Sequence, residues 1–307
     1  MADTPASYSM QEYLTAKRSV DDRALNRRVL DRVTTFLDER DAPDVLEVGA
    51  GTGAMVARAL AWDLLPDGTA YTAIEIDPDS VALARETVRA AARAADYRIS
   101  EQAAEEVRLV RDDREITVTV READAFAFVE RAERTWDLLI GAAFADLVGA
   151  SAVERLLGAV PDGACYFPIT FDGMTRFHPA ADPAFDALIE RRYHATMNDG
   201  ALGSQAGRRL VSELKGAGWD VPAVGGADWT IHPTGGTYPE GEGYVLHYLL
   251  ETIASAVDDQ PDVDGERLEQ WLTRRHRQVT DGELLFVAHN LDVFGQHESN
   301  GDRADAA

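Results

Sequence analysis

The sequence contains almost no cysteine and almost no lysine. Its 307 residues include one cysteine, Cys165, which excludes an intramolecular disulfide and any metal site built from several cysteines. Lysine occurs only at Lys17 and Lys215, so nearly all of the 30 positively charged side chains are arginine. Disulfides are rare in reducing compartments, and we therefore expect a cytoplasmic protein.

Long apolar runs are also missing. Residues 1–20 contain no apolar stretch of the length found in signal peptides. The most apolar stretch, residues 138–153, is too short to cross a bilayer and contains Asp146. The sequence therefore predicts no membrane span.

Negative charge is abundant. The chain has 54 Asp and Glu against 30 Lys and Arg, a formal net charge of −24, yet 45% of its residues are hydrophobic, which excludes an acidic disordered chain. A carboxylate-rich surface stays hydrated in concentrated salt, and the salt screens the self-repulsion, so we interpret the charge as halophilic adaptation. The same charge argues against a nucleic-acid partner, which would bind a basic surface.

Strand-like and helix-like segments alternate along most of the chain. Strands are expected at 45–48, 69–76, 114–124, 135–144, 163–171, 221–232 and 283–295, and helices at 54–62, 80–95, 208–219, 243–257 and 266–276. This alternation predicts an α/β fold with a Rossmann-like, mostly parallel seven-stranded sheet and helices on both faces. The polar stretch 96–113 is interpreted as a surface insertion.

We divide the chain into three parts. Residues 1–40 form an N-terminal helical segment and a candidate lid, with a short helix at 10–18 and a longer one at 20–39 whose expected N-cap is Ser19. Residues 41–295 form the main domain, with substrate-side insertions around 172–207 and 233–280. Residues 296–307 are a polar tail.

Three glycines follow the first expected strand. Gly49, Gly51 and Gly53 lack a Cβ, so the backbone there can turn sharply and approach a ligand, at the sheet edge where ligands bind. Alternatively, the three glycines form a turn that only connects the strand to the helix. The spacing differs from the dinucleotide-binding and P-loop patterns. Residues 46–53, LEVGAGTG, resemble the first motif of the class I S-adenosylmethionine-dependent methyltransferases.

The resemblance implies S-adenosyl-L-methionine as cofactor. It covers residues 44–171 well and extends more weakly to 208–232 and to 283–295, where the family inserts an antiparallel strand. Glu75, at the end of the second strand, corresponds to the acid that accepts hydrogen bonds from the ribose diol. Asp77, before Pro78, is better explained as a helix N-cap.

Further positions of the cofactor site follow from the same resemblance. In the family an acid at the position of Asp124 accepts from the adenine amino group, and the backbone N–H of the next residue, here Ala125, meets the ring. Alternatively, Asp124 only caps a helix that starts at Ala125. Glu47 resembles the family's acid near the methionine portion of the cofactor. Alternatively, Glu47 does not contact the cofactor and supports residues that do. The expected cofactor-binding residues are Glu47, Gly49, Ala50, Gly51, Gly53, Glu75, Asp124 and Ala125.

Methyl transfer from a sulfonium requires mainly correct orientation of the reactants and removal of water. A general base is needed only when the acceptor must lose a proton. His178 and His194 are candidate catalytic bases, although a lone histidine is more often structural. Trp229, Tyr238 and Tyr244 are candidates for an apolar acceptor pocket, or core residues. His232, His247 and His289 are spaced too irregularly to indicate a metal site.

The expected function is methyl transfer to oxygen, nitrogen or carbon of a small-molecule or other non-polymeric acceptor. Residues 141–146 lack the Asn/Asp-Pro-Pro-Tyr/Phe signature of enzymes that methylate nucleobase or glutamine nitrogens. Two alternatives stay open: a non-catalytic cofactor-binding regulatory or scaffold protein, and an aminopropyltransferase-like enzyme. The sequence does not indicate the oligomeric state.

Overall fold

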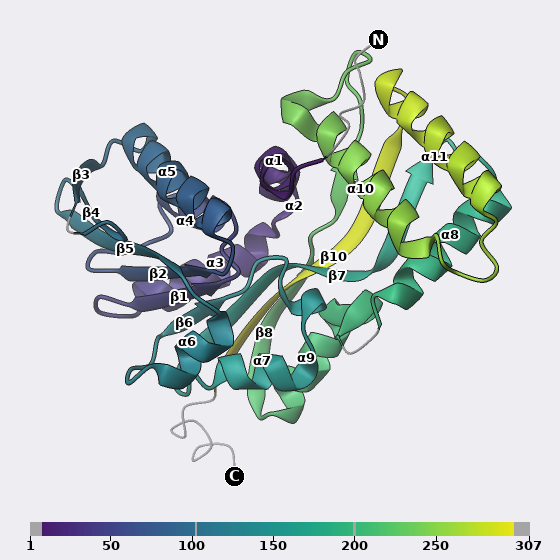
Figure 1. Cartoon of the computed structure of the whole chain (residues 1–307). Helices are drawn as coiled ribbons and strands as arrows, with labels where there is room; N and C mark the ends of the chain where they lie inside the picture. The colour runs from purple at the N-terminus through teal and green to yellow at the C-terminus, as the bar shows by residue number, and fades with distance from the viewer. Residues whose placement is uncertain (1–7, 102, 199–200, 298–307) are drawn as a thin grey trace.

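The computed structural model describes residues 8–101, 103–198 and 201–297, and its strands form one sheet in the order β3-β4-β5-β2-β1-β6-β7-β10-β8, with β9 beside β10 (Figure 1). The strands are β1 Asp44–Val48, β2 Ala70–Glu75, β3 Arg98–Glu101, β4 Glu106–Arg111, β5 Arg114–Glu122, β6 Leu138–Ile140, β7 Ala164–His178, β8 Trp219–Gly226, β9 Trp229–Ile231 and β10 Leu285–His297. The five central strands, β5 to β7 in this order, are parallel. β10 lies antiparallel between β7 and β8. The Rossmann-like α/β fold with an antiparallel last strand is confirmed.

Helices cover both faces of the sheet. They are α1 Met10–Ala16, α2 Arg18–Ala24, α3 Arg27–Asp38, α4 Ala54–Ala61, α5 Pro78–Ala94, α6 Ala125–Arg131, α7 Ala150–Leu157, α8 Pro183–Thr196, α9 Ala206–Gly216, α10 Glu242–Val257 and α11 Gly265–Thr280. Buried side chains of α3, α4 and α5 belong to one hydrophobic cluster, and those of α7 and α9 to a second. In Figure 1 these two groups lie on opposite sides of the sheet. The central strands are therefore buried on both faces, as parallel strands require.

The sheet has ten strands among the described residues, so the expectation of seven is too low. Residues 96–113 are not a bare surface insertion, because β3 and β4 form a hairpin that extends the sheet beyond β5. In β4, Val107 and Leu109 are buried while Arg108 between them is exposed. This strand alternation is short and flanked by charges, which hides it in the sequence. The strand expected at 221–232 is divided into β8 and β9, with Ala227 and Asp228 between them.

The helix expected at 20–39 is interrupted. Leu25 has extended backbone angles and ends α2, and the Asn26 side chain caps α3 by accepting from the backbone N–H of Val29. Ser19 is therefore not an N-cap, and its expected role is wrong. It lies inside α2, where its hydroxyl donates to the buried carboxylate of Glu242 at 2.9 Å. The Ser19 hydroxyl therefore makes a long-range contact instead of capping a helix.

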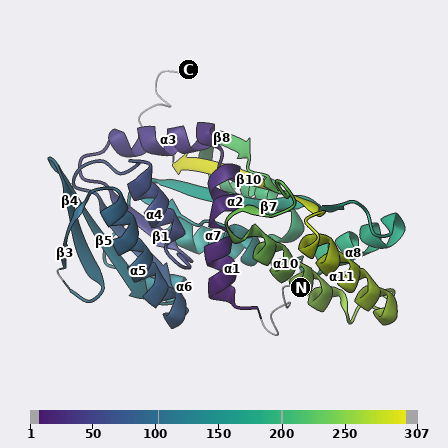
Figure 2. The ribbon, with the colours of Figure 1, turned by 90° about the horizontal axis from the view of Figure 1, so that it is seen from above.

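The insertions form a subdomain on the extended ends of β7 and β10. The stretch around Tyr193, within the expected insertion 172–207, belongs to α8, which lies beside α10 and α11 (Figure 1). Seen from above, α1 lies between α4/α5 and α10 (Figure 2), and it contacts α10 directly. Residues 1–7 of the N-terminal segment and 298–307 of the tail lie outside the described residues. In the described part of the chain, no helix is long and apolar enough to cross a membrane.

Candidate functional site

A cavity of about 740 Å³ opens at the carboxyl ends of the central strands. The glycine loop after β1 forms part of its wall, and Gly49, Gly51 and Gly53 all have positive φ angles of 64°, 53° and 78°. A Cβ at Gly49 would come within 2.6 Å of the Phe144 ring, which follows β6. A side chain at Gly49 would therefore be both strained and blocked, so the close approach of the loop to Phe144 requires glycine.

The Glu75 carboxylate is fixed at the edge of this cavity. One oxygen accepts from the backbone N–H of Gly51 at 2.8 Å. The other accepts from the backbone N–H groups of Ile76 at 2.8 Å and Asp77 at 3.0 Å. The carboxylate thus joins the tip of β2 to the glycine loop, and a carboxylate oxygen can accept more than one hydrogen bond. Asp77 caps α5 by accepting from the backbone N–H of Ser80 at 2.8 Å, as expected.

Asp124 and Ala125 line the same cavity from the end of β5. The Asp124 side chain caps α6 by accepting from the backbone N–H of Ala127 at 2.8 Å. The capping role considered from the sequence is therefore present. The other carboxylate oxygen of Asp124 takes no part in the cap.

Glu47 is buried in the cavity wall, with 1% of its surface exposed. The Tyr71 hydroxyl donates to its carboxylate at 2.9 Å. Burial raises the pKa of Glu47 to about 8, against the opposing effects of Tyr71 and the Arg58 charge. A buried carboxyl that is largely protonated at neutral pH is poised to ionise when a cation enters the cavity.

Asp21 on α2 and Arg58 on α4 are charged groups of the cavity wall that sequence reasoning missed. Lys17 forms an ion pair with Asp21 at 2.8 Å, and the buried guanidinium of Arg58 lies 3.3 Å from the same Asp21 oxygen. The other Asp21 oxygen is buried and has no hydrogen-bond partner among the described residues. All three side chains line the cavity. Their meeting depends on how α2 packs on α4, which no local pattern indicates.

Neither candidate histidine lines this cavity. His178 is exposed on β7, paired with Leu285 of β10. His194 lies on α8, where its Nε2 is 3.0 Å from the hydroxyl of Thr175, a residue of the cavity wall. Burial lowers the pKa of His194, so the ring is neutral at neutral pH. Their roles as bases stay predictions that the geometry of the cavity does not favour.

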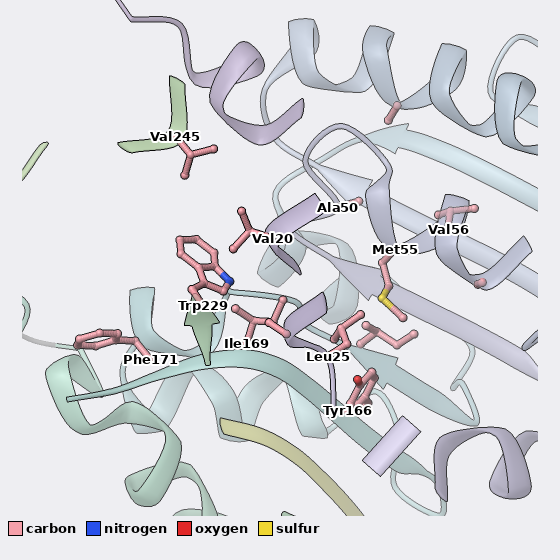
Figure 3. Packing of buried hydrophobic residues seen from close by; sticks show 14 of the residues in the cluster. Val20, Leu25, Ala50, Met55, Val56, Tyr166, Ile169, Phe171, Trp229 and Val245 are labelled. Carbon is pink, nitrogen blue, oxygen red and sulfur yellow. The ribbon is translucent and has the colours of Figure 1, made fainter. Parts of the chain in front are cut away.

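The side of the cavity away from Glu75 is aromatic and apolar. Figure 3 shows Trp229, Ile169 and Phe171 on the β7 and β9 side, facing Ala50 and Met55 across the interior. Of the three aromatics considered for an acceptor pocket, only Trp229 lines the cavity. The Tyr238 hydroxyl instead bonds to the backbone of Leu284, and the Tyr244 hydroxyl to the backbone of Ser9. Further apolar side chains on this side come from Tyr13, Tyr193, Met197, Leu249, Ile253 and Phe286.

Asp146 also lines the cavity, in the short 3-10 helix Ala145–Leu147 that follows β6. Its Oδ1 is buried and has no hydrogen-bond partner among the described residues. Burial raises the pKa of Asp146 to about 6, and a hydrogen bond with its own backbone and the charge of Lys17 oppose the shift. In the sequence Asp146 is one carboxylate among many, and only the folded chain shows that its Oδ1 is left without a hydrogen-bond partner among the described residues.

Comparison with known proteins gives remote likenesses. No protein-family model matches the sequence. A segment of 63 residues, 20% of this chain, is 44% identical to the "Probable ribosomal RNA small subunit methyltransferase A" of Haloquadratum walsbyi, and it spans only 20% of that protein.

Two solved structures are similar over most of the chain. The S-adenosylmethionine-dependent methyltransferase of Thiobacillus denitrificans, in complex with S-adenosyl-L-homocysteine, is 15% identical, with a TM-score of 0.46 and coverage of 94% of this chain and 98% of that one. The S-adenosylmethionine-dependent methyltransferase of Geobacter sulfurreducens, in the same kind of complex, is 17% identical, with a TM-score of 0.45 and coverage of 97% of this chain and 100% of that one. Because these sequence identities and TM-scores are low, the assignment of function rests on the residues of the cavity.

Proposed function

We propose that the cavity binds S-adenosyl-L-methionine and that the protein transfers its methyl group to a small-molecule or other non-polymeric acceptor. One observation carries the proposal: the glycine loop after β1, Glu75 at the tip of β2 and Asp124 after β5 line a single cavity. Ligands of open parallel sheets bind at this edge, and a carboxylate after the second strand suits a ribose diol.

The nucleoside would lie between β2 and α6. Glu75 would accept from the ribose hydroxyls, because its position is already fixed by three backbone N–H groups. Asp124 and the backbone N–H of Ala125 would meet the adenine edge. Ile76, which lines the cavity with 63% of its surface exposed, would be covered by the flat face of the base. An apolar side chain left exposed at a cavity mouth is typical of a ligand-binding surface.

The methionine end would face the buried charges. Glu47 and the unpartnered oxygen of Asp21 are suited to an ammonium or sulfonium. The bound sulfonium would supply an activated methyl group. The protein would contribute position and a dry, largely apolar enclosure, which together can account for much of the rate of a displacement.

The cavity wall does not favour a polyanionic acceptor such as RNA. Its cationic side chains, Lys17 and Arg58, are both paired with Asp21. Binding of a phosphate backbone depends on cations that are free to replace counterions. The non-polymeric acceptor expected from the net charge therefore remains the preferred proposal.

Calorimetric titration with S-adenosylmethionine and S-adenosylhomocysteine tests the cofactor. We expect Glu75→Ala to weaken binding by about 10- to 100-fold, since a hydrogen bond to a charged group contributes about 1.5–3 kcal/mol. Glu122→Ala is the matched control, because Glu122 pairs with Glu75 across the sheet but is exposed and outside the cavity wall. Unchanged affinity in a folded Glu75→Ala variant would contradict the ribose assignment.

A second experiment separates an enzyme from a binding protein. Labelled S-adenosylmethionine is incubated with the protein and fractionated cell extract, and we expect label in a low-molecular-mass fraction. Binding without transfer to any fraction would favour a regulatory or scaffold role. Transfer only from the decarboxylated cofactor would favour an aminopropyltransferase.

A further inference from the structure

The aromatic and apolar side of the cavity, away from Glu75, is the acceptor end in the proposed function. Its walls are mostly aromatic and aliphatic, and its tyrosines, Tyr13 and Tyr193, stay neutral. Burial, together with the charge of Asp146, raises the pKa of Tyr193 to about 12. Burial, together with the charge of Asp21, raises the pKa of Tyr13 well above its ordinary value. Asp146 lines the same cavity as both tyrosines, and its charge adds to the shift at Tyr193.

Six carboxylates line the cavity, and five of them have partners in the described structure: Asp21, Glu47, Glu75, Asp77 and Asp124. Asp21 is paired with Lys17 and Arg58, and Glu47 accepts from Tyr71. The remaining three accept from backbone N–H groups at the strand ends and helix starts.

Asp146 differs from these five carboxylates. Among the described residues it forms no ion pair, and its buried Oδ1 has no hydrogen-bond partner. The carboxylate has a backbone hydrogen bond only within its own residue. A buried carboxylate oxygen without a donor is costly, and such groups persist mainly at functional sites.

Asp146 is also held close to the glycine loop. Phe144, two residues earlier, packs against Gly49, and Ala143 is tied to β7 by a 2.9 Å hydrogen bond from its N–H to the Pro168 carbonyl. The short helix that carries Asp146 therefore lies over the part of the cavity where the first glycine of the loop approaches. In the proposed function this is the region of the transferred methyl group.

The mouth of the cavity is apolar as well. Four large apolar side chains are exposed among the described residues: Met10, Ile76, Leu147 and Val224. The first three line the cavity, and Leu147, which directly follows Asp146, has 70% of its surface exposed. An apolar rim around an apolar interior is suited to a molecule that enters from water with little charge of its own.

From these observations we infer that the acceptor is an apolar molecule with a hydroxyl group, and that Asp146 receives the hydroxyl proton. This inference rests on the proposed methyl transfer. The oxygen would form the new bond to the methyl carbon, and the carbon–sulfur bond would break with its electrons passing to sulfur. The hydroxyl proton would go to the Asp146 carboxylate and then to water, so the products are a methyl ether and S-adenosylhomocysteine.

The chemistry of Asp146 agrees with this role. Its pKa of about 6 keeps the carboxylate ionised at neutral pH but makes it a stronger base than an ordinary aspartate. A phosphorylated acceptor would instead need an unpaired cation, and both cations of the cavity wall are paired.

Equilibrium dialysis of the protein saturated with S-adenosylhomocysteine tests the inference, with 1-naphthol as the probe and 1-methoxynaphthalene as the probe without a hydroxyl. We expect the wild type to bind 1-naphthol about tenfold or more tightly than its methyl ether, because the ether cannot donate to Asp146. In Asp146→Ala the two probes should bind alike. Asp162→Asn, an exposed site outside the cavity wall, should keep the wild-type preference.

The outcomes separate the two levels of the proposal. Equal binding of the two probes to the wild type, or a preference that persists in Asp146→Ala, would overturn the role of Asp146 and leave the cofactor assignment intact. Failure of S-adenosylhomocysteine to bind the folded wild type would overturn both. Bound S-adenosylhomocysteine together with a hydroxyl preference that depends on Asp146 would support both.

Discussion

Glu47 is a buried acid whose charge state depends on what occupies the cavity. It is enclosed by β1 and β2, and its one hydrogen-bond donor is the Tyr71 hydroxyl. Burial raises the pKa of Glu47 to about 8, so the acid is mostly protonated when the cavity holds no cation. A positively charged ligand favours the carboxylate and would lower this pKa. Binding and proton release are therefore expected to be coupled.

We expect S-adenosylmethionine binding at about pH 7 to release more protons from the wild type than from Glu47→Gln, with a difference of up to about one proton per site. The measurement is calorimetry in two buffers of different ionisation enthalpy. The Glu47→Gln variant removes the titrating group and keeps a hydrogen-bond acceptor for Tyr71. Protons exchanged by the ligand's own amino group contribute to both measurements, so the difference between the two proteins reports Glu47. Identical proton counts for the two proteins would show that Glu47 does not respond to the ligand.

Asp146 provides a second prediction, about stability. Its pKa is raised to about 6, above the value of about 3.9 expected in the unfolded chain, so the folded state binds more protons between these two values. The ionised group therefore lowers the free energy of unfolding as the pH rises through this interval. We expect Asp146→Asn to unfold at a higher temperature than the wild type at pH 7 and to show no such gain at pH 4. A variant that is less stable at pH 7 would mean that Asp146 has a structural partner.

At the residue scale, the sequence predicts the parts of the site that follow strand ends and leaves out the rest. Glu75, at the end of β2, and Asp124, just after β5, are expected because they match positions of the family that the sequence resembles, and parallel strands bring these ends to one edge. Asp21 and Asp146 are not expected, because their distinguishing property is burial without a full set of partners. That property arises from the packing of α2 and of the segment after β6, which the residues nearby in sequence do not determine.

At the scale of elements, those set by the local sequence pattern were expected, and those set by contacts with distant parts of the chain were not. β1 and β2 are short apolar runs followed by turn residues, and the alternation with helices predicts them correctly. β4 is missed because charged residues alternate with its buried ones, and α2 and α3 are merged because Leu25 continues the helical apolar pattern. The break there is stabilised from outside the segment, since the backbone N–H of Asn26 donates to Asp292 of β10 at 2.8 Å.

Asp292 connects three elements. It lies in β10, at a shift in the β7–β10 register, and it is fully buried. Besides Asn26, it accepts from the backbone N–H of Ile169 in β7 at 2.8 Å and from the Tyr166 hydroxyl at 3.3 Å. Ile169 lines the cavity with a φ of 55°, which is rare for a β-branched residue. The carboxylate thus holds a strained part of the cavity wall in place.

We expect Asp292→Ala to lower the free energy of unfolding by about 3 kcal/mol or more, because two buried backbone donors would lose their partner at about 1–3 kcal/mol each. Urea titration measures the change. Asp220→Ala is the control, an exposed carboxylate on the neighbouring strand β8. Equal losses in the two variants would show that the buried hydrogen bonds of Asp292 contribute little.

At the scale of the whole molecule, the dominant feature is the net charge of −24. Many of the ion pairs on the surface join an arginine to an acid with both side chains partly exposed, for example Arg114 with Asp63 and Arg192 with Asp262. Exposed pairs of this kind contribute little to stability, and they leave most of the excess carboxylates without a cation. The repulsion among these carboxylates is distributed over the surface and opposes the compact state.

Salt should therefore stabilise the fold. We expect the melting temperature, followed by circular dichroism, to rise as KCl increases from about 0.05 M to 3 M, and to rise most steeply below about 1 M, where the screening length falls from more than 10 Å to about 3 Å. Sorbitol at matched osmolality is the control, because it changes water activity without screening charge and should produce a smaller rise. A melting temperature that stays level or decreases in KCl would show that the acidic surface is not adapted to salt. A decrease would further mean that the Arg–Asp and Arg–Glu pairs, which salt weakens, contribute more to stability than the carboxylate repulsion costs.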